Sequence, residues 1–201
     1  MQLTYAAASP FVRKVRVVLA ETGQQDDVEL LPVETGPLAP APEVSAANPL
    51  SKIPALIRPD GPALYDSRVI TRFLNARAGA DLYPAAREWE VLTLEATGDA
   101  IMEAAVLMVY EKRWRPGDKQ DHSWMDAQWS KVSGALDALN SRWMSHLAGP
   151  LDIGQISVGC ALGYLDFRHD DRQWRHGHDA LDDWFAVFGE RDAMRATRPD
   201  A

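Results

Sequence analysis

The pattern of apolar residues changes once along the chain, close to Pro84. Before that point, short apolar runs alternate with amphipathic segments, which is typical of a domain that mixes strands and helices. After it, every strong periodicity is that of a helix. We therefore predict an α/β domain at residues 1–79, a linker at 80–85 and an all-helical domain at 86–201. A chain of 201 residues is long enough for two domains of this size.

The first domain is expected to follow the order βαβ and then ββα. Ser9 and Pro10 have the pattern of a helix start, and Gly23 ends that helix. The Pro-Asp-Gly sequence at 59–61 supplies the turn chemistry of a hairpin. Prolines between residues 34 and 48 argue against a long element there. The expected elements are a strand at 3–5, a helix at 10–22, a strand at 28–33, a hairpin of 55–58 with 63–65, and a helix from 67 to near 79.

The second domain is expected to be built around long helices. One is predicted at 86–115 and another at about 125–143, and the two are expected to pack antiparallel. A third, at 151–167, is apolar on nearly all sides, so we expect it in the centre of the domain. Asp152 and Gln155 have the spacing of a capping box at its start.

Charge and cysteine content narrow the range of partners and locations. The chain has 29 acidic and 21 basic residues, and its formal net charge of -8 disfavours binding to nucleic acid or anionic lipid. Cys160 is the only cysteine, so no internal disulfide is possible. The N-terminus lacks the pattern of a secretory signal, and no apolar run is long enough to cross a membrane. We therefore expect a cytoplasmic protein with no nucleic-acid or membrane partner.

The hydroxyl of Ser9 stands at the start of a helix that follows a strand. Free backbone amides and the positive end of the helix dipole meet at such a position, which favours an anion or a thiolate. The alternative is a structural role, in which Ser9 caps the helix and Pro10 occupies its first position. The residues alone leave both interpretations open.

Two further segments have features of binding sites. Pro54 precedes a strand, and a cis bond between Ile53 and Pro54 would expose the Ile53 N–H and C=O together for pairing with an extended peptide. Asp66 and Ser67 begin a helix, where free amides attract a carboxylate and Asp66 can accept a hydrogen bond from an ammonium group. An ordinary trans proline and an ordinary helix cap are the alternatives for these segments.

In this order, the three segments resemble those of glutathione transferases of the bacterial cytosolic type. The resemblance spans the whole chain and rests on Ser9–Lys14, Asn48–Leu56, Tyr65–Ser67 and Gly163–Arg168. It implies a thioredoxin-like N-terminal domain, an all-helical C-terminal domain and a homodimer. It also implies that glutathione is the co-substrate, bound mainly by the first domain, and that no metal is needed.

The resemblance assigns roles to particular side chains. Ser9 would donate a hydrogen bond to the glutathione sulfur and favour the thiolate. The backbone of Ile53, beside a cis Pro54, would pair with the cysteinyl unit. Asp66 and Ser67 would receive the amine and the carboxylate of the γ-glutamyl unit.

The glycyl carboxylate of glutathione needs a cation. Lys52 is the first candidate and Arg13 the second, and Phe11 belongs to the same first-helix segment. The glutathione-binding residues expected are therefore Phe11, Arg13, Lys52, Ile53, Pro54, Asp66 and Ser67. Because a serine stands where related proteins carry a cysteine, thiol–disulfide exchange is not expected.

The electrophile pocket would be lined by the long helix of the second domain. Met102, Val106 and Tyr110 are the candidates, and packing in the core or in a dimer is the alternative for each. Asp99 and Glu103 on the same helix could instead face the glutathione of a partner subunit. The sequence does not identify the electrophile.

The expected function is the transfer of glutathione to a small hydrophobic electrophile, as in detoxification. One alternative is a non-catalytic binding or regulatory protein on the same scaffold, because a fold alone does not grant activity. Another is a specialised glutathione-dependent isomerase, dehalogenase or peroxidase. His169, His176 and His178 lie near one another in sequence, but no rigid element fixes their spacing, so we expect no metal site.

Overall fold

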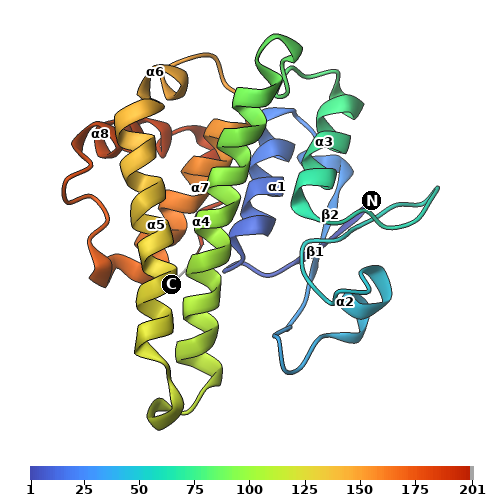
Figure 1. Ribbon diagram of the computed structural model, residues 1–201. Helices are drawn as coiled ribbons and strands as arrows, with labels where there is room; N and C mark the ends of the chain where they lie inside the picture. Colours follow the sequence, from blue (N-terminus) through green and yellow to red (C-terminus); the bar gives the residue numbers. More distant parts are fainter. Residues whose placement is uncertain (200–201) are drawn as a thin grey trace.

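The computed structural model describes residues 1–199. Its N-terminal part is built on a three-stranded sheet in the order β2-β1-β3, formed by β1 (Gln2–Tyr5), β2 (Glu29–Pro32) and β3 (Leu56–Ile57). β1 lies parallel to β2 and antiparallel to β3. Two helices, α1 (Pro10–Glu21) and α3 (Ser67–Ala78), pack against each other beside the sheet (Figure 1). α1 connects the parallel strands, so the chain opens with the expected βαβ unit.

Helices are the only regular secondary structure of the C-terminal part among the residues described. Its α-helices are α4 (Glu88–Trp114), α5 (His122–Arg142), α6 (Met144–Leu147), α7 (Ile153–His169), α8 (Asp179–Phe188) and α9 (Asp192–Ala196). Short 3₁₀ turns lie at Ala85–Arg87, Gly117–Lys119 and Asp170–Arg172, and the N-terminal part has another at Gln25–Asp27. α4 and α5 run antiparallel, and α7 lies between this pair and α1 (Figure 1). The predicted fold class, a thioredoxin-like part followed by an all-helical part, is confirmed. Within residues 1–199, none of the helices combines the length and the apolar character that crossing a membrane requires.

Two details of the N-terminal part differ from the sequence-based expectation. A short helix, α2 (Pro42–Ala47), forms in the proline-containing segment, with Pro42 at its first position. The hairpin is reduced to one bridge, in which Leu56 and Leu64 exchange backbone hydrogen bonds of 2.9 Å. The Pro62 carbonyl is occupied by the Arg58 guanidinium at 3.0 and 3.1 Å, and a proline cannot donate to a ladder, so pairing stops there.

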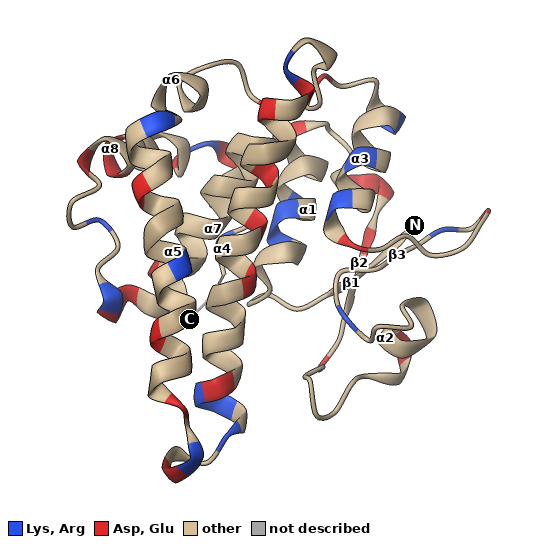
Figure 2. Cartoon of the chain, viewed as in Figure 1, with Lys and Arg blue, Asp and Glu red and all other residues tan. Residues whose placement is uncertain are grey.

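A buried ion cluster joins the two parts of the molecule. Lys14 of α1 is fully buried, and its Nζ lies 2.7 Å from Asp99 Oδ1 and 3.2 Å from Glu95 Oε1, both on α4. Ser157 of α7 donates to Asp99 at 2.9 Å, and the Tyr83 hydroxyl donates to Glu95 at 3.2 Å. Figure 2 shows basic residues of α1 beside acidic bands on α4. Because buried charges are tolerated only with partners, the cluster of Lys14, Glu95 and Asp99 fixes α1 against α4.

The central helix α7 begins with the predicted capping box. Asp152 Oδ1 accepts from the Gln155 amide at 3.2 Å, and Gln155 Oε1 accepts from the Asp152 amide at 3.0 Å. The other carboxylate oxygen of Asp152 lies 2.8 Å from His146 Nε2. The Asp152 side chain is fully buried, so it has no access to water that could replace these partners.

Replacing Asp152 with alanine is expected to lower the free energy of unfolding by about 2 kcal/mol, the upper end of the range for an N-cap. The value lies at the upper end because the variant also leaves His146 without its partner. Urea unfolding measures the loss. Asp152→Asn is the control, since asparagine caps a helix as well as aspartate does. An equal loss in both variants would contradict the role of the cap.

Candidate functional site

Ser9 lies between β1 and α1 and caps the helix. Its Oγ accepts a hydrogen bond from the Val12 amide at 3.3 Å, and its backbone is extended. That bond uses a lone pair, and within residues 1–199 the hydroxyl donates to no acceptor. Pro10 has no N–H, and the Phe11 amide likewise has no partner in the described residues. The structural and chemical roles of Ser9 are therefore compatible, because the oxygen caps the helix while the hydrogen stays available to an anion.

The turn at Ile53 and Pro54 lies beside the end of β1 that leads to Ser9. The peptide bond between these two residues is cis. Ala55 is tied to Thr4 of β1 twice, because its amide donates to Thr4 Oγ1 at 2.8 Å and its carbonyl accepts from the Thr4 amide at 3.0 Å. The Ile53 N–H and C=O form no hydrogen bond with any residue from 1 to 199. They are therefore available to a peptide ligand.

Two polar residues that hold this turn were not predicted from the sequence. One is Thr4, a fully buried residue of β1. The other is Asn48, whose side chain donates to the Lys52 carbonyl at 2.9 Å and accepts from the Leu50 amide at 3.0 Å. An asparagine directly before a proline is a signal for such a turn. The partner of Thr4, by contrast, is Ala55, which is 51 residues away, so no local sequence pattern predicts this contact.

Asp66 and Ser67 begin α3. Asp66 Oδ1 accepts from the Arg68 amide at 3.0 Å, and Oδ2 accepts from the Arg68 guanidinium at 2.9 Å. Partial burial acts to raise the pKa of Asp66, but the hydrogen bonds and charge of Arg68 outweigh it and hold the pKa below its usual range. Ser67 is buried, and neither its amide nor its hydroxyl is bonded within the described part of the chain. The start of α3 thus offers an ionised acceptor next to two donors that have no partner among residues 1–199.

The two cations expected at the glycyl carboxylate lie in different environments. Lys52 is exposed beside Ile53, and its ammonium group forms no ion pair with residues 1–199. Arg13 is buried, and its guanidinium donates to the Met194 carbonyl at 3.0 Å and to Thr197 Oγ1 at 3.5 Å. In contrast to the expectation, Arg13 faces α7 and α9 and is not available to a ligand at Ser9, because its position in the helical turn directs it into the other domain.

The three candidates for the electrophile pocket differ in how deeply they are buried. Met102 is fully buried in the core, which corrects its assignment, because it lies on a face of α4 that other helices cover. Val106 is partly buried against the core. Tyr110 lines an open groove of about 630 Å³, together with Leu107 and Trp114. Burial raises the pKa of Tyr110, although the charge of Arg113 opposes this, so its hydroxyl is protonated at neutral pH.

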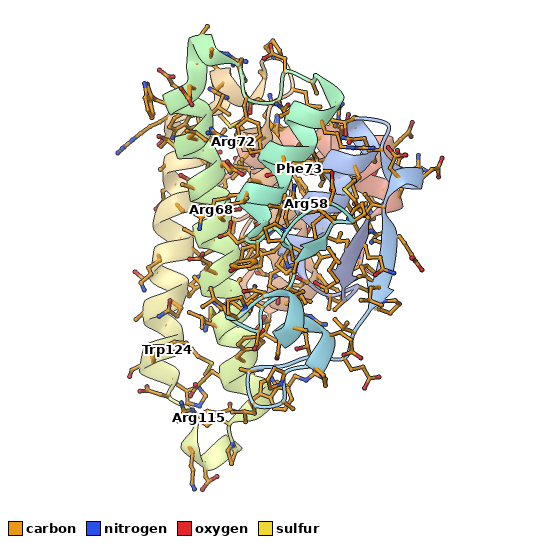
Figure 3. The ribbon with its side chains drawn as sticks, turned by 90° about the vertical axis from the view of Figure 1, so that its right-hand side faces the viewer. Arg58, Arg68, Arg72, Phe73, Arg115 and Trp124 are labelled. Carbon is orange, nitrogen blue, oxygen red and sulfur yellow. The ribbon has the colours of Figure 1, made fainter. Side chains whose placement is uncertain are left out.

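The groove lies between the end of α4, the start of α5 and the segment before α2. Figure 3 shows two of its residues, Arg115 and Trp124, at the far end of the helix pair from Arg72. Its walls are apolar and aromatic over most of their area, and its full lining is Pro37, Leu38, Leu107, Tyr110, Glu111, Trp114, Arg115, Asp121 and Trp124. Such a surface suits an aromatic or otherwise hydrophobic molecule.

Other reactive side chains are occupied elsewhere. Burial raises the pKa of the Cys160 thiol to about 11, so it is not a thiolate at neutral pH. His169 Nε2 lies 3.0 Å from the Ala105 carbonyl, and His178 lies within hydrogen-bond distance of the Trp174 carbonyl and of Asp137. Among residues 1–199, no three histidine, cysteine or acidic side chains are placed to hold a metal ion.

Two family models match the chain. Residues 8–77 match the model described as "Glutathione S-transferase, N-terminal domain", and residues 123–186 match "Glutathione S-transferase, C-terminal domain". The first matched range contains Ser9, the turn at Pro54 and the start of α3. The second contains most of α5 and all of α7.

Solved structures and a curated protein are similar to the chain over nearly its full length. A glutathione transferase family member from Pseudomonas fluorescens Pf-5, solved with bound glutathione, is 44% identical, with coverage of 100% of this chain and 99% of that one and a TM-score of 0.97. A second structure from that organism holds S-(propanoic acid)-glutathione and is 43% identical, with complete coverage of both chains and a TM-score of 0.92. The uncharacterized GST-like protein YibF of Escherichia coli (strain K12) is 28% identical over 179 residues, 87% of this chain and 86% of YibF.

Proposed function

The chain belongs to the glutathione transferase family, and we propose that it binds glutathione and transfers it as a thiolate to a small hydrophobic electrophile. The observation that carries this proposal is the hydroxyl hydrogen of Ser9 at the start of α1, which is donated to no acceptor within residues 1–199. The bound glutathione in a relative that is 44% identical supports the choice of ligand.

The proposed contacts use groups of the N-terminal part, most of which have no hydrogen-bond partner within residues 1–199. The Ile53 N–H and C=O pair with the cysteinyl unit of glutathione, beside Pro54. Asp66 accepts from the γ-glutamyl amine, and the Ser67 amide and hydroxyl donate to the γ-glutamyl carboxylate. Lys52 is the cation for the glycyl carboxylate. The Phe11 amide adds a donor near the sulfur.

The chemistry is attack by the glutathione sulfur on an electrophilic carbon. A free thiol has a pKa of about 8.5, so only a few per cent is ionised at neutral pH. Lowering that pKa to about 6.5 requires roughly 2.7 kcal/mol of preferential stabilisation of the thiolate. A hydrogen bond to a charged acceptor contributes about 1.5 to 3 kcal/mol, and a helix N-terminus about 0.3 to 1 kcal/mol more. The Ser9 hydroxyl and the start of α1 are therefore sufficient.

The electrophile is proposed to bind along α4, where Val106 and Tyr110 remain candidates for its pocket. The apolar and aromatic groove around Tyr110 suits a hydrophobic molecule. A relative binds a glutathione conjugate of propanoic acid, so an unsaturated carboxylic acid is a reasonable second test compound. The proposal also includes a homodimer in the cytoplasm, and light scattering on the purified protein tests the dimer.

Calorimetry with glutathione, followed by conjugation assays, tests the proposed function. The assays use an activated aryl halide and an α,β-unsaturated acid as electrophiles. We expect saturable binding and turnover with at least the aryl halide. Binding without turnover of a range of electrophiles would indicate a non-catalytic glutathione-binding protein. Product analysis would distinguish a transferase from an isomerase, a dehalogenase or a peroxidase.

Replacing Asp66 with asparagine is expected to weaken glutathione binding about tenfold, because a charge-assisted hydrogen bond to the amine is lost. The variant should fold, since asparagine caps α3 equally well. Calorimetry measures the change. Asp60→Asn, which removes the same charge from an exposed turn of the same domain, is the control and should bind as the native protein does. If Asp66→Asn and the native protein bind glutathione with equal affinity, Asp66 does not bind the amine.

A further inference from the structure

Arg68 stands between the start of α3 and the buried ion cluster. Its Nη2 donates to Asp66 Oδ2 at 2.9 Å, and its Nε lies 3.7 Å from Asp99 Oδ2. Figure 3 shows Arg68 between α3 and α4. The side chain is 52% exposed, so it is not locked by packing. The guanidinium therefore has two carboxylates within reach, one at the proposed glutathione site and one at the domain interface.

Acidic residues of α4 offer the guanidinium a second location. Asp99 and Glu103 lie one helical turn apart. Hydrogen bonding to Asp66 makes the largest contribution to raising the pKa of Arg68, and the charges of Asp99 and Glu103 add to it. Glu103 is exposed and forms no ion pair with another residue between 1 and 199. All three carboxylates thus attract Arg68, and no other cation from residues 1 to 199 forms an ion pair with Glu103.

The amine of glutathione and the guanidinium of Arg68 need the same carboxylate. Asp66 Oδ1 already accepts from the Arg68 amide as part of the helix cap, and Oδ2 accepts from the Arg68 side chain. An ammonium group that binds Asp66 must therefore compete with the side chain of Arg68. A ligand that lacks the amine meets no such competition.

We propose that Arg68 is a positioning residue that occupies Asp66 in the unliganded protein and moves to Asp99 and Glu103 when the amine of glutathione binds. This inference rests on the proposed function. Asp66 keeps one cationic partner throughout the exchange, and the guanidinium keeps a carboxylate partner, so neither charge is left unpaired. Arg68 thereby sets how much the amine contributes to affinity.

Two ligands measured against two proteins test the exchange. The ligands are glutathione and glutaryl-cysteinylglycine, which lacks only the amino group. Calorimetry gives the ratio of their affinities for the native protein and for Arg68→Gln. We expect the ratio in favour of glutathione to rise about threefold in the variant, the size of a lost exposed ion pair. A general disturbance of the fold would not produce this change, because the two ligands share all other contacts.

Two further variants sharpen the test. Arg72→Gln removes the same charge one turn later on α3, from a side chain that is 51% exposed and pairs with Glu88 at 3.5 Å, so the ratio should stay unchanged. Glu103→Gln removes one carboxylate that would receive the displaced guanidinium. In the native background, the affinity for glutathione relative to glutaryl-cysteinylglycine should therefore fall. It should not fall in the Arg68→Gln background, where nothing is displaced.

The possible outcomes separate the inference from the proposed function. Glutathione binding with an unchanged ratio in Arg68→Gln would overturn the exchange and leave the function standing. Equal loss of both ligands in that variant would assign Arg68 to the γ-glutamyl carboxylate and would also overturn it. If the native protein binds no glutathione, the proposed function fails and the exchange fails with it.

Discussion

Replacing Ser9 with alanine is expected to reduce the rate of glutathione conjugation about ten- to a hundredfold, the equivalent of one hydrogen bond to a charged acceptor. The hydroxyl of Ser9 is the side-chain donor at the start of α1 whose hydrogen is unused within residues 1–199. Without it, the bound thiol keeps a pKa closer to its value in solution, so less of it is ionised at neutral pH. Steady-state kinetics at neutral pH measures the loss.

The same substitution removes a helix cap, so loss of stability must be separated from loss of chemistry. Ser9→Gly is the matched control, because glycine at an N-cap costs only a few tenths of a kcal/mol relative to serine. It should lose as much activity as Ser9→Ala while unfolding nearly as the native protein does. Ser9→Thr keeps a hydroxyl and should keep much of the activity. Full activity in both the alanine and the glycine variants would exclude the proposed role.

Replacing Lys14 with methionine is expected to lower the free energy of unfolding by about 3 to 5 kcal/mol, as for other buried ion pairs that lose one partner. Lys14 is fully buried, and the variant removes the cation that Glu95 and Asp99 share in the domain interface, leaving Asp99 only the more distant Arg68 at 3.7 Å within residues 1–199. Urea unfolding measures the change. Lys119→Met, at an exposed position, is the control and should change stability little.

The loss in Lys14→Met should depend on pH. Burial raises the pKa of Glu95, and the Lys14 ammonium opposes this effect. Once the ammonium is gone, the pKa of Glu95 rises further, and the folded state binds a proton that the unfolded state has released. Stability of the variant then falls as pH rises from the unfolded pKa of Glu95 through its folded pKa. The variant should therefore lose less stability at mildly acidic than at alkaline pH, and a loss independent of pH would contradict the account.

Local signals were sufficient for the helix caps and for most of the predicted elements, but not for α2 or for the extent of the hairpin. Each cap is specified by residues only a few positions apart. Ser9 directly precedes Pro10, and Asp152 lies three positions before Gln155. Asp66 and Ser67 were found in the same way, as the start of a helix. The change of periodicity near Pro84 indicated the two kinds of architecture, since each period is set by the backbone geometry of its element.

Contacts distant in sequence could not be predicted. Arg13 and Lys14 are neighbours in an amphipathic helix, and nothing local shows that both are buried against the other domain. The partners of Lys14 lie 81 and 85 residues away. Met102 was assigned to a pocket because α4 is apolar on several faces, and only the packing of the other helices shows which face is covered. The position of Arg68 between two carboxylates required the structure for the same reason.

The central claim is that the Ser9 hydroxyl stabilises the thiolate of bound glutathione, and the pKa of the bound thiol tests it most directly. Ultraviolet absorbance of the thiolate, titrated against pH with glutathione saturating the protein, gives this pKa. We expect a value of about 6.5 in the native protein and a return toward about 8.5 in Ser9→Ala and Ser9→Gly. A bound thiol that titrates near its solution pKa in the native protein, or equally low in all three proteins, would contradict the claim.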